Sequence, residues 1–304
     1  MVRRSGRVVL KVAWKEKSLR VLSLIMTLLL VLLCNVNGIA ASDRPQSVCG
    51  TPDVPLDLAQ AVEDLSAKLR PSVPKASAIR IPIAFHVIYA GQNGLVTNTQ
   101  IRMLVRNING AFRGTPFSFY LSSVDRTESV NWYSNCGLGS RVERRMKLKL
   151  ARDPSNVLNI YSCTATTGPP GQVVAGFAYL PFMFAESSFM HGVVLHPSVL
   201  PGGSSPDYGR FGLIGAHEVG HYLGLYHIFQ GGCTDGDFVA DTPAQLNAHF
   251  GCPVGSDTCP SAAGLDDVRN YMDYTSDTCM NHFTAGQMDR MVSQSQVYRP
   301  SLWQ

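Results

Sequence analysis

The sequence lacks an apolar stretch long enough to cross a membrane as a helix. Its longest apolar segment, Val21 to Cys34, falls short of the roughly 20 residues that such a helix needs. The chain contains no Asn-x-Ser/Thr sequence, so N-glycosylation is not expected. It also contains no internal repeat and no low-complexity tract, which argues against a repeat architecture.

The short apolar segment follows a basic N-terminal stretch. Seven Lys and Arg residues precede it against the single acid Glu16, and small residues follow at Gly38 to Ser42. This order predicts a secretory signal peptide over residues 1–41 and a secreted, extracellular product. An uncleaved signal anchor that holds an ectodomain at the cell surface is the alternative.

Removal of this segment changes the charge balance. The whole chain is formally +4. Residues 1–41 hold seven basic residues and one acid, so the remainder is about −2. The basic pI of 8.6 therefore comes from the signal peptide and gives no reason to expect nucleic acid or a membrane surface as a partner.

Beyond the signal peptide, the composition divides the chain in two. Residues 42–78 are rich in Pro, Ala and Ser, with one amphipathic stretch at 56–69, which predicts a pro-segment or linker outside the core. Residues 79–304 are expected to form one α/β domain. Alternating apolar residues from Ile79 to Tyr89 predict a strand with one buried face. Further strands are expected near 117–124, 157–161, 173–180 and 192–195, and helices at 97–112 and 284–298.

The pattern that carries chemistry is His217-Glu218-Val-Gly-His221, followed by Gly224 and His227. Residues four apart lie on one face of a helix, so His217 and His221 can present their imidazoles to the same ion. Gly224 can adopt a positive φ and end the helix, which lets the chain turn and bring His227 to that ion. Three His ligands with a fourth position open for water predict one catalytic Zn²⁺.

Glu218 is adjacent to the first ligand and is predicted to activate a zinc-bound water as general base. No Glu follows it in the chain, which excludes a zinc site completed by a downstream glutamate. The other histidines are expected to be hydrogen-bonded structural residues: His86, His191, His196, His249 and His282.

The zinc motif resembles the extended signature of the metzincin peptidases, and Asn270-Tyr-Met272-Asp-Tyr274 is similar to their Met-containing turn. The context from Cys233 to Cys279 is similar to the pappalysin family (peptidase family M43), in particular its small secreted fungal and microbial endopeptidases. The resemblance implies that Met272 packs beneath the histidines and that the Tyr274 hydroxyl helps to stabilise the oxyanion. A plain core tyrosine is the alternative for Tyr274.

The resemblance also implies the fold of residues 79–304 as a catalytic domain. Its upper part, 79–224, is expected to contain a twisted mixed sheet and helices. Its lower part, 225–304, is expected to be irregular and stapled by disulfides.

Seven cysteines remain after the signal peptide, and six of them can pair in an oxidising compartment. Spacing alone does not select a connectivity. The resemblance implies that Cys49 is the latency ligand of a zymogen, which fills the open zinc position; a disulfide to Cys136 or Cys163 is the alternative. The resemblance further implies the pairs Cys233–Cys259 and Cys252–Cys279, which leaves Cys136 and Cys163 for each other.

Acidic residues lead to two further expectations. Asp235, Asp237 and Asp241 follow the third zinc ligand, and their oxygens are candidate ligands for Ca²⁺; an Asp-rich surface turn is the alternative. Asp277 is expected to line the pocket for the residue after the scissile bond, which would favour Arg or Lys there.

These features together predict a secreted, monomeric zinc metalloendopeptidase that acts on proteins or peptides. The alternative is a catalytically inactive zinc-binding protein that serves extracellular adhesion or inhibition. The intact Glu218 and Tyr274 argue against that alternative.

Overall fold

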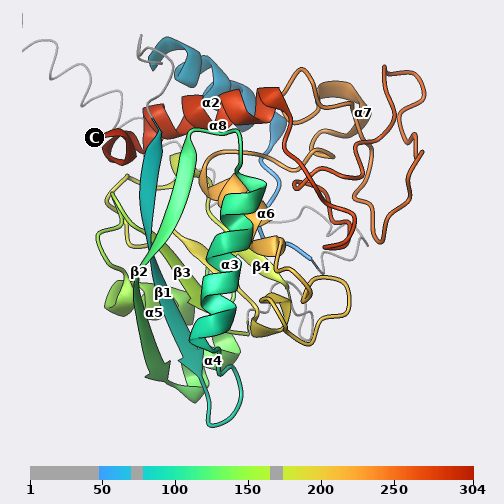
Figure 1. The fold of residues 1–304 in the computed structure, drawn as a ribbon. Helices are drawn as coiled ribbons and strands as arrows, with labels where there is room; N and C mark the ends of the chain where they lie inside the picture. The colour runs from blue at the N-terminus through green and yellow to red at the C-terminus, as the bar shows by residue number, and fades with distance from the viewer. Residues whose placement is uncertain (1–47, 70–77, 165–173) are drawn as a thin grey trace, which may run out of the picture. The chain divides into compact units, whose positions relative to one another are not determined.

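A five-stranded sheet organises the residues that the computed structural model describes, namely 48–69, 78–164 and 174–304 (Figure 1). The strand order is β2-β1-β3-β5-β4. Four strands are parallel, and β4 pairs antiparallel with β5 at one edge. The strands are β1 (Ile79–Tyr89), β2 (Phe117–Glu128), β3 (Leu158–Ser162), β4 (Gly176–Ala178) and β5 (Val193–Leu195).

The central strand β1 differs from its sequence prediction, because both of its faces are buried. One face carries Ile83 and Phe85 into the main core, while Ala84 and Ile88 on the other face are also buried. The expectation of a single buried face was therefore wrong. Helices cover both sides of the sheet, as is usual where parallel strands pair. They are α3 (Asn98–Ala111) and α6 (Ile214–Tyr222) on the main-core side, and α4 (Val130–Asn135) and α5 (Arg141–Leu150) on the other.

Several charged and polar side chains buried in the sheet region are paired, although the Tyr161 hydroxyl and Ser162 Oγ have no hydrogen-bond partner among the described residues. His86 Nδ1 lies 2.9 Å from an Asp125 carboxylate oxygen, and its Nε2 lies 3.0 Å from Asn159 Oδ1. On the α5 side, Lys147 Nζ lies 2.8 Å from Glu143 Oε1, and both side chains are fully buried. Such pairing is required, because an unpaired buried charge costs several kcal/mol (about 3–5).

Two helices begin at capping boxes. Thr97 caps α3 together with Gln100, and Thr284 caps α8 (Ala285–Tyr298) together with Gln287. In each box the Thr hydroxyl accepts the N3 amide hydrogen, which satisfies a donor that the helix itself leaves free.

The segment after the predicted signal peptide is part of the packed structure. Helix α2 (Leu56–Leu69) lies beside α8 in Figure 1, and Val48 and Cys49 belong to the main core. The expectation that this segment lies outside the core was therefore wrong for its described residues. The predicted signal peptide, 1–41, lies outside the described residues. No helix within the described ranges is long and apolar enough to span a membrane.

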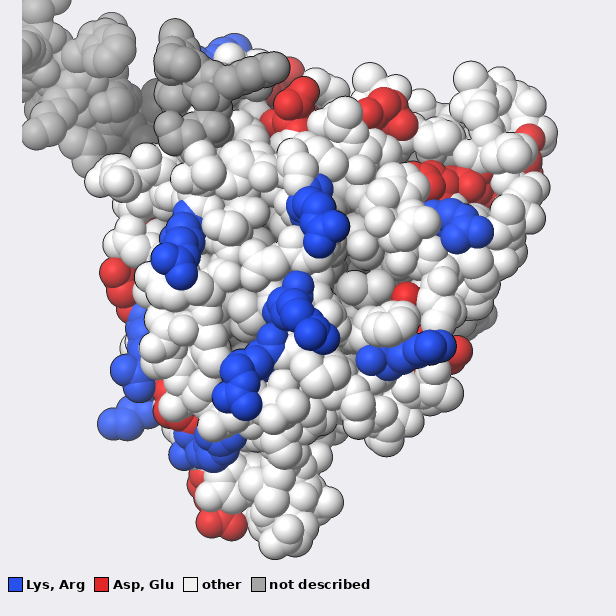
Figure 2. All heavy atoms as spheres, in the orientation of Figure 1, with Lys and Arg blue, Asp and Glu red and all other residues white. Residues whose placement is uncertain are grey.

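Between His227 and α8 the chain is irregular, with the single short helix α7 (Gly232–Asp235). Disulfides Cys233–Cys259 and Cys252–Cys279 link this part, and Cys136–Cys163 joins the end of α4 to the end of β3, so all three expected pairs are confirmed. Short 3-10 turns complete the described structure: η1 (Pro181–Met183), η2 (Pro197–Val199) and η3 (Pro300–Trp303). Figure 2 shows Lys and Arg side chains dispersed over one face, with mostly uncharged surface between them.

Candidate active site

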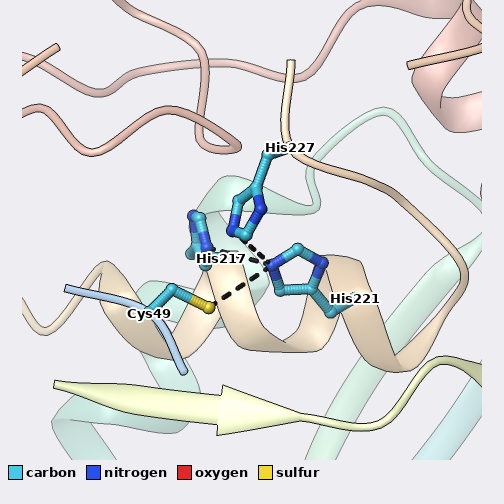
Figure 3. A group of neighbouring side chains, drawn as sticks. All are labelled: Cys49, His217, His221 and His227. Atoms are coloured by element: carbon cyan, nitrogen blue, oxygen red, sulfur yellow. Dashed lines mark hydrogen bonds between the residues drawn. The ribbon is translucent and has the colours of Figure 1, made fainter. Parts of the chain in front are cut away.

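Three histidine side chains converge at the end of α6 (Figure 3). His217 and His221 lie one turn apart on the helix, and Gly224, with φ of 108°, bends the chain so that His227 joins them. His221 Nε2 lies 3.1 Å from Nε2 of His217 and 3.1 Å from Nε2 of His227. A Cβ atom at position 224 would lie 2.5 Å from the Cβ of Gln294 in α8, so there is no room for a side chain at Gly224.

The protons of these imidazoles are directed away from the point of convergence. Nδ1 of His217 faces the Tyr271 carbonyl at 2.7 Å, and Nδ1 of His221 faces the Leu225 carbonyl at 2.8 Å. His227 Nδ1 faces Asp53 Oδ1 at 3.2 Å. Each Nδ1 therefore carries the proton, and three Nε2 lone pairs meet. Burial lowers the pKa of His217 to about 3, which keeps it neutral, the form that binds metals.

The spacing of these atoms fits a tetrahedral zinc ion. Zinc–nitrogen bonds of about 2.0–2.1 Å place tetrahedral ligand nitrogens roughly 3.3 Å apart, and a thiolate sulfur roughly 3.6 Å from each nitrogen. The observed nitrogen separations are 3.1 Å, and Cys49 Sγ lies 3.6 Å from His221 Nε2. Among the described residues, these four form the one group of at least three His, Cys, Asp or Glu side chains that can share a metal ion.

Cys49 reaches this group from a strand-like segment paired with β4. It forms a parallel bridge with Gly176, and the Gly50 amide donates to the Gly176 carbonyl at 2.8 Å. The thiol is free and buried, so the alternative of a Cys49 disulfide is not found. Burial and the neighbouring Glu218 carboxylate raise the pKa of the thiol. Hydrogen bonds from Thr51 act in the opposite direction, and a cation held by the imidazoles would favour the thiolate further.

Glu218 is buried beside the three imidazoles. Its Oε2 lies 3.4 Å from the Thr51 hydroxyl, which shares its one proton between this oxygen and the Ala178 carbonyl at 3.0 Å, and Oε1 has no hydrogen-bond partner among the described residues. Burial raises the pKa of Glu218 to about 8. On its other side lies Gly176, where a Cβ would stand 3.0 Å from Glu218 Oε1.

The predicted Met-containing turn lies beneath the histidines. Met272 is fully buried, and its Sδ would meet a Cβ at Gly220 at 2.6 Å, so only glycine fits on that side of α6. The Asn270 side chain shapes the turn, because its Oδ1 accepts the Met272 amide hydrogen at 2.9 Å and a Gln287 hydrogen at 3.0 Å.

Tyr274 follows the turn and lies over the imidazoles. Its hydroxyl is 3.2 Å from His227 Nε2 and 3.5 Å from the Cys49 carbonyl. Burial raises the pKa of Tyr274 well above its usual value, so its hydroxyl stays a neutral donor. The structure therefore places this hydroxyl at the point where the three imidazoles and Cys49 meet.

The expected acidic residues lie further out. The Asp277 carboxylate accepts the amide hydrogens of Phe211, Gly212 and Leu213, at 2.7–2.9 Å, just before α6. Asp237 accepts from Val239 and Thr242.

Asp241 accepts from Thr284 and Gly286 at the start of α8, at 2.7 and 2.8 Å. The side chain of Asp235 lies outside the described residues. The calcium expectation stays a prediction, without support from these contacts.

The family model described as Pregnancy-associated plasma protein-A (peptidase family M43) matches residues 149–296. An extracellular metalloprotease of Verticillium alfalfae is 35% identical over 278 residues, which is 87% of this chain and 94% of the relative. One of Sordaria macrospora is 41% identical over 234 residues, 75% of this chain and 78% of the relative. The chain belongs to the pappalysin family.

Solved structures agree with this membership. Promirolysin of Tannerella forsythia superimposes with a TM-score of 0.71 at 27% identity, covering 84% of this chain and 97% of that chain. Mature mirolysin of the same organism, in complex with a cleaved peptide, gives a TM-score of 0.63 at 28% identity, covering 75% and 96%. This pappalysin is therefore an extracellular zinc metalloendopeptidase whose substrates are peptides or proteins.

Sequence reasoning missed three residues that shape the site of this pappalysin. Thr51 and Asp53 contact Glu218 and His227 across more than 160 residues of chain. Their proximity to Cys49 was a signal, because a segment that delivers a ligand also delivers its neighbours. Gly176 gave no signal, since a glycine in a predicted strand does not reveal what packs against it.

Replacement of Gly176 by Ala is expected to lower kcat/KM of the activated enzyme by at least about tenfold, because the added methyl would meet the Val194 carbonyl at 2.9 Å and the Glu218 carboxylate at 3.0 Å. Peptide hydrolysis and zinc content measured together check this, with zinc expected at one ion per chain. Gly110→Ala in α3 is the control, since nothing lies within 4 Å of its Cβ position. Unchanged kcat/KM in Gly176→Ala would contradict the role of this glycine.

Proposed function

We propose that this pappalysin cleaves peptide bonds with zinc held by His217, His221 and His227, and with Glu218 as the general base. The observation that carries the proposal is the meeting of three Nε2 lone pairs beside a buried carboxylate. Zinc bound there supplies Lewis-acid chemistry, polarising the carbonyl of the substrate and lowering the pKa of water. The protein supplies the proton transfers and the positioning.

Glu218 takes the proton from the attacking water and passes it to the leaving amine. Its raised pKa, about 8, suits a group that must both accept and return a proton near neutral pH. Tyr274 remains protonated because it is buried, so its hydroxyl can donate a hydrogen bond to the developing oxyanion. The Tyr274 hydroxyl lies close enough to the imidazoles for this role, at 3.2 Å from His227 Nε2.

We further propose that the described chain is a latent form. Val48 to Thr51 occupies the edge of β4, Cys49 takes the fourth ligand position, and Thr51 holds the Glu218 carboxylate. A bound substrate would require the edge of β4, the fourth ligand position and the Glu218 carboxylate to be free at the same time. The likeness to promirolysin covers a larger share of this chain than the likeness to mature mirolysin, which supports a pro-segment here.

Glu218→Gln is expected to reduce peptide hydrolysis by at least about a thousandfold, since the amide cannot accept the proton of water. Zinc content and thermal stability should remain near those of the unaltered protein. A chelator should abolish the activity of the unaltered enzyme, and added zinc should restore it. Turnover by Glu218→Gln above that of the zinc-free enzyme would refute the assignment.

Cys49→Ser in the full chain is expected to raise hydrolysis of a small peptide by about tenfold or more before any proteolysis, because a hydroxyl is a much weaker zinc ligand than a thiolate. The comparison is made on uncut protein, with its integrity checked by mass spectrometry. The exposed neighbour Pro52→Ala keeps the thiol and should stay latent. Equal latency of Cys49→Ser and the unaltered chain would count against the thiol lock.

A preference for Lys or Arg after the scissile bond rests on Asp277 alone. Three amide donors already share that carboxylate, so its attraction for a substrate cation is expected to be about 1 kcal/mol, or roughly fivefold in kcat/KM. A proteome-derived peptide library, digested with and without chelator, measures this enrichment. Equal cleavage before Leu and before Lys would leave Asp277 with a structural role only.

The monomeric state expected from the sequence stays a prediction.

A further inference from the structure

Helix α2 packs on an apolar surface, called the groove below, that is formed by the residues around Leu180 and Tyr226 and by α8. Its buried residues, Ala59, Val62 and Ser66, recur every three or four positions and so share one face. Ala59 and Val54 form a separate small core with Leu180 and Tyr226. Partly buried apolar side chains border that core: Leu58, Phe182, Met183 and Phe238.

Polar contacts fix the position of α2 in this groove. Arg290 of α8 places Nη2 2.7 Å from Glu63 Oε1, and Gln294 Nε2 donates to Ser66 Oγ at 3.2 Å. The Arg290 guanidinium also stacks over the Tyr226 ring, at 4.4 Å from its centroid, and its Nε donates to the Gly224 carbonyl at 3.0 Å. The groove therefore recognises an amphipathic helix with a small residue and an acid at set positions.

Every one of these contacts is noncovalent and independent of the chain that joins α2 to β1. A cut between Leu69 and Ile79 would leave the groove contacts, the β4 pairing and the Cys49 ligand unchanged. Only a few residues, Pro52 to Pro55, join the segment that pairs with β4 to helix α2. The docked helix therefore keeps Cys49 at a high local concentration near the imidazoles.

We propose that this groove is a docking site for residues 48–69 as a separate polypeptide, so that a single cut before β1 leaves the enzyme inhibited. This inference rests on the proposed latent state and extends it: the helix, besides the thiol, holds the inhibitory segment. Activation then requires a second cut between Cys49 and α2, or removal of α2 from its groove.

The test uses the full chain with the recognition sequence of a site-specific protease at residues 71–76. After the cut, gel filtration and mass spectrometry show whether the segment stays bound, and hydrolysis of a small peptide shows whether the enzyme is active. The unaltered groove should retain the segment and keep activity at or below about one tenth of that of segment-free enzyme.

Two matched substitutions on α2 separate docking from other effects. Ala59→Asp puts a charge in the groove and should release the segment after the cut, with activity rising about tenfold or more. Ala61→Asp on the exposed side should behave as the unaltered chain. Where Ala59→Asp prevents folding, a synthetic peptide of residues 46–69 added to segment-free enzyme gives the same comparison.

The outcomes distinguish this inference from the proposed function. Loss of the segment from the unaltered chain upon cutting overturns the docking proposal, even if the enzyme is active. Retention of the segment in a Glu218→Gln background supports docking without any need for catalysis. Absence of activity in every variant, including segment-free enzyme with zinc, would overturn the proposed function and leave the docking result standing.

Discussion

The close approach of three imidazole lone pairs is the constraint on which the rest of the site depends. Uncharged lone pairs 3.1 Å apart gain nothing from one another, so surrounding groups must hold the rings until a cation joins them. The three Nδ1 partners come from separate places: the Tyr271 carbonyl in the turn, the Leu225 carbonyl after the helix, and Asp53 just before α2. Such partners fix both the tautomer and the ring orientation of metal ligands. The hydrogen-bonded turn, the bend at Gly224 and the buried helix α6 hold the groups that meet this requirement.

The edge strand β4 contacts both the Cys49 segment and Glu218. An edge strand presents backbone groups that can pair with an added chain. Here Val48 and Gly50 take those groups, while the Thr51 hydroxyl exchanges hydrogen bonds with Ala178. Because Glu218 packs against Gly176 of the same strand, a segment paired with β4 also lies next to the Glu218 carboxylate. A chain that pairs with the edge of β4 therefore takes up space beside this carboxylate at the same time.

The spacing of apolar residues along the sequence predicted the helices whose ends depend on nearby residues. The span of α2 matches the amphipathic stretch at 56–69, and the spans of α3 and α8 match the helices predicted at 97–112 and 284–298 to within one residue at each end. Helix α5 was missed because its sequence is highly charged, and its burial depends on the pairing of Lys147 with Glu143. The two buried faces of β1 were missed for the same reason, since burial depends on what packs against a strand from elsewhere in the chain.

The irregular part after His227 shows why acidic residues were ambiguous in the sequence. With little helix and no long strand, this part has many backbone donors that need acceptors. Carboxylates supply them: Asp241 holds the start of α8, Asp273 accepts the amides of His249 and Tyr274, and Asp277 holds the entry to α6. One carboxylate can accept from several donors at once, whereas a disulfide fixes only two points along the chain. Closely spaced Asp residues can bind a cation or accept hydrogen bonds from the backbone amides of a loop. The sequence is the same in both cases, so only the positions of the amide donors in the structure distinguish the two roles.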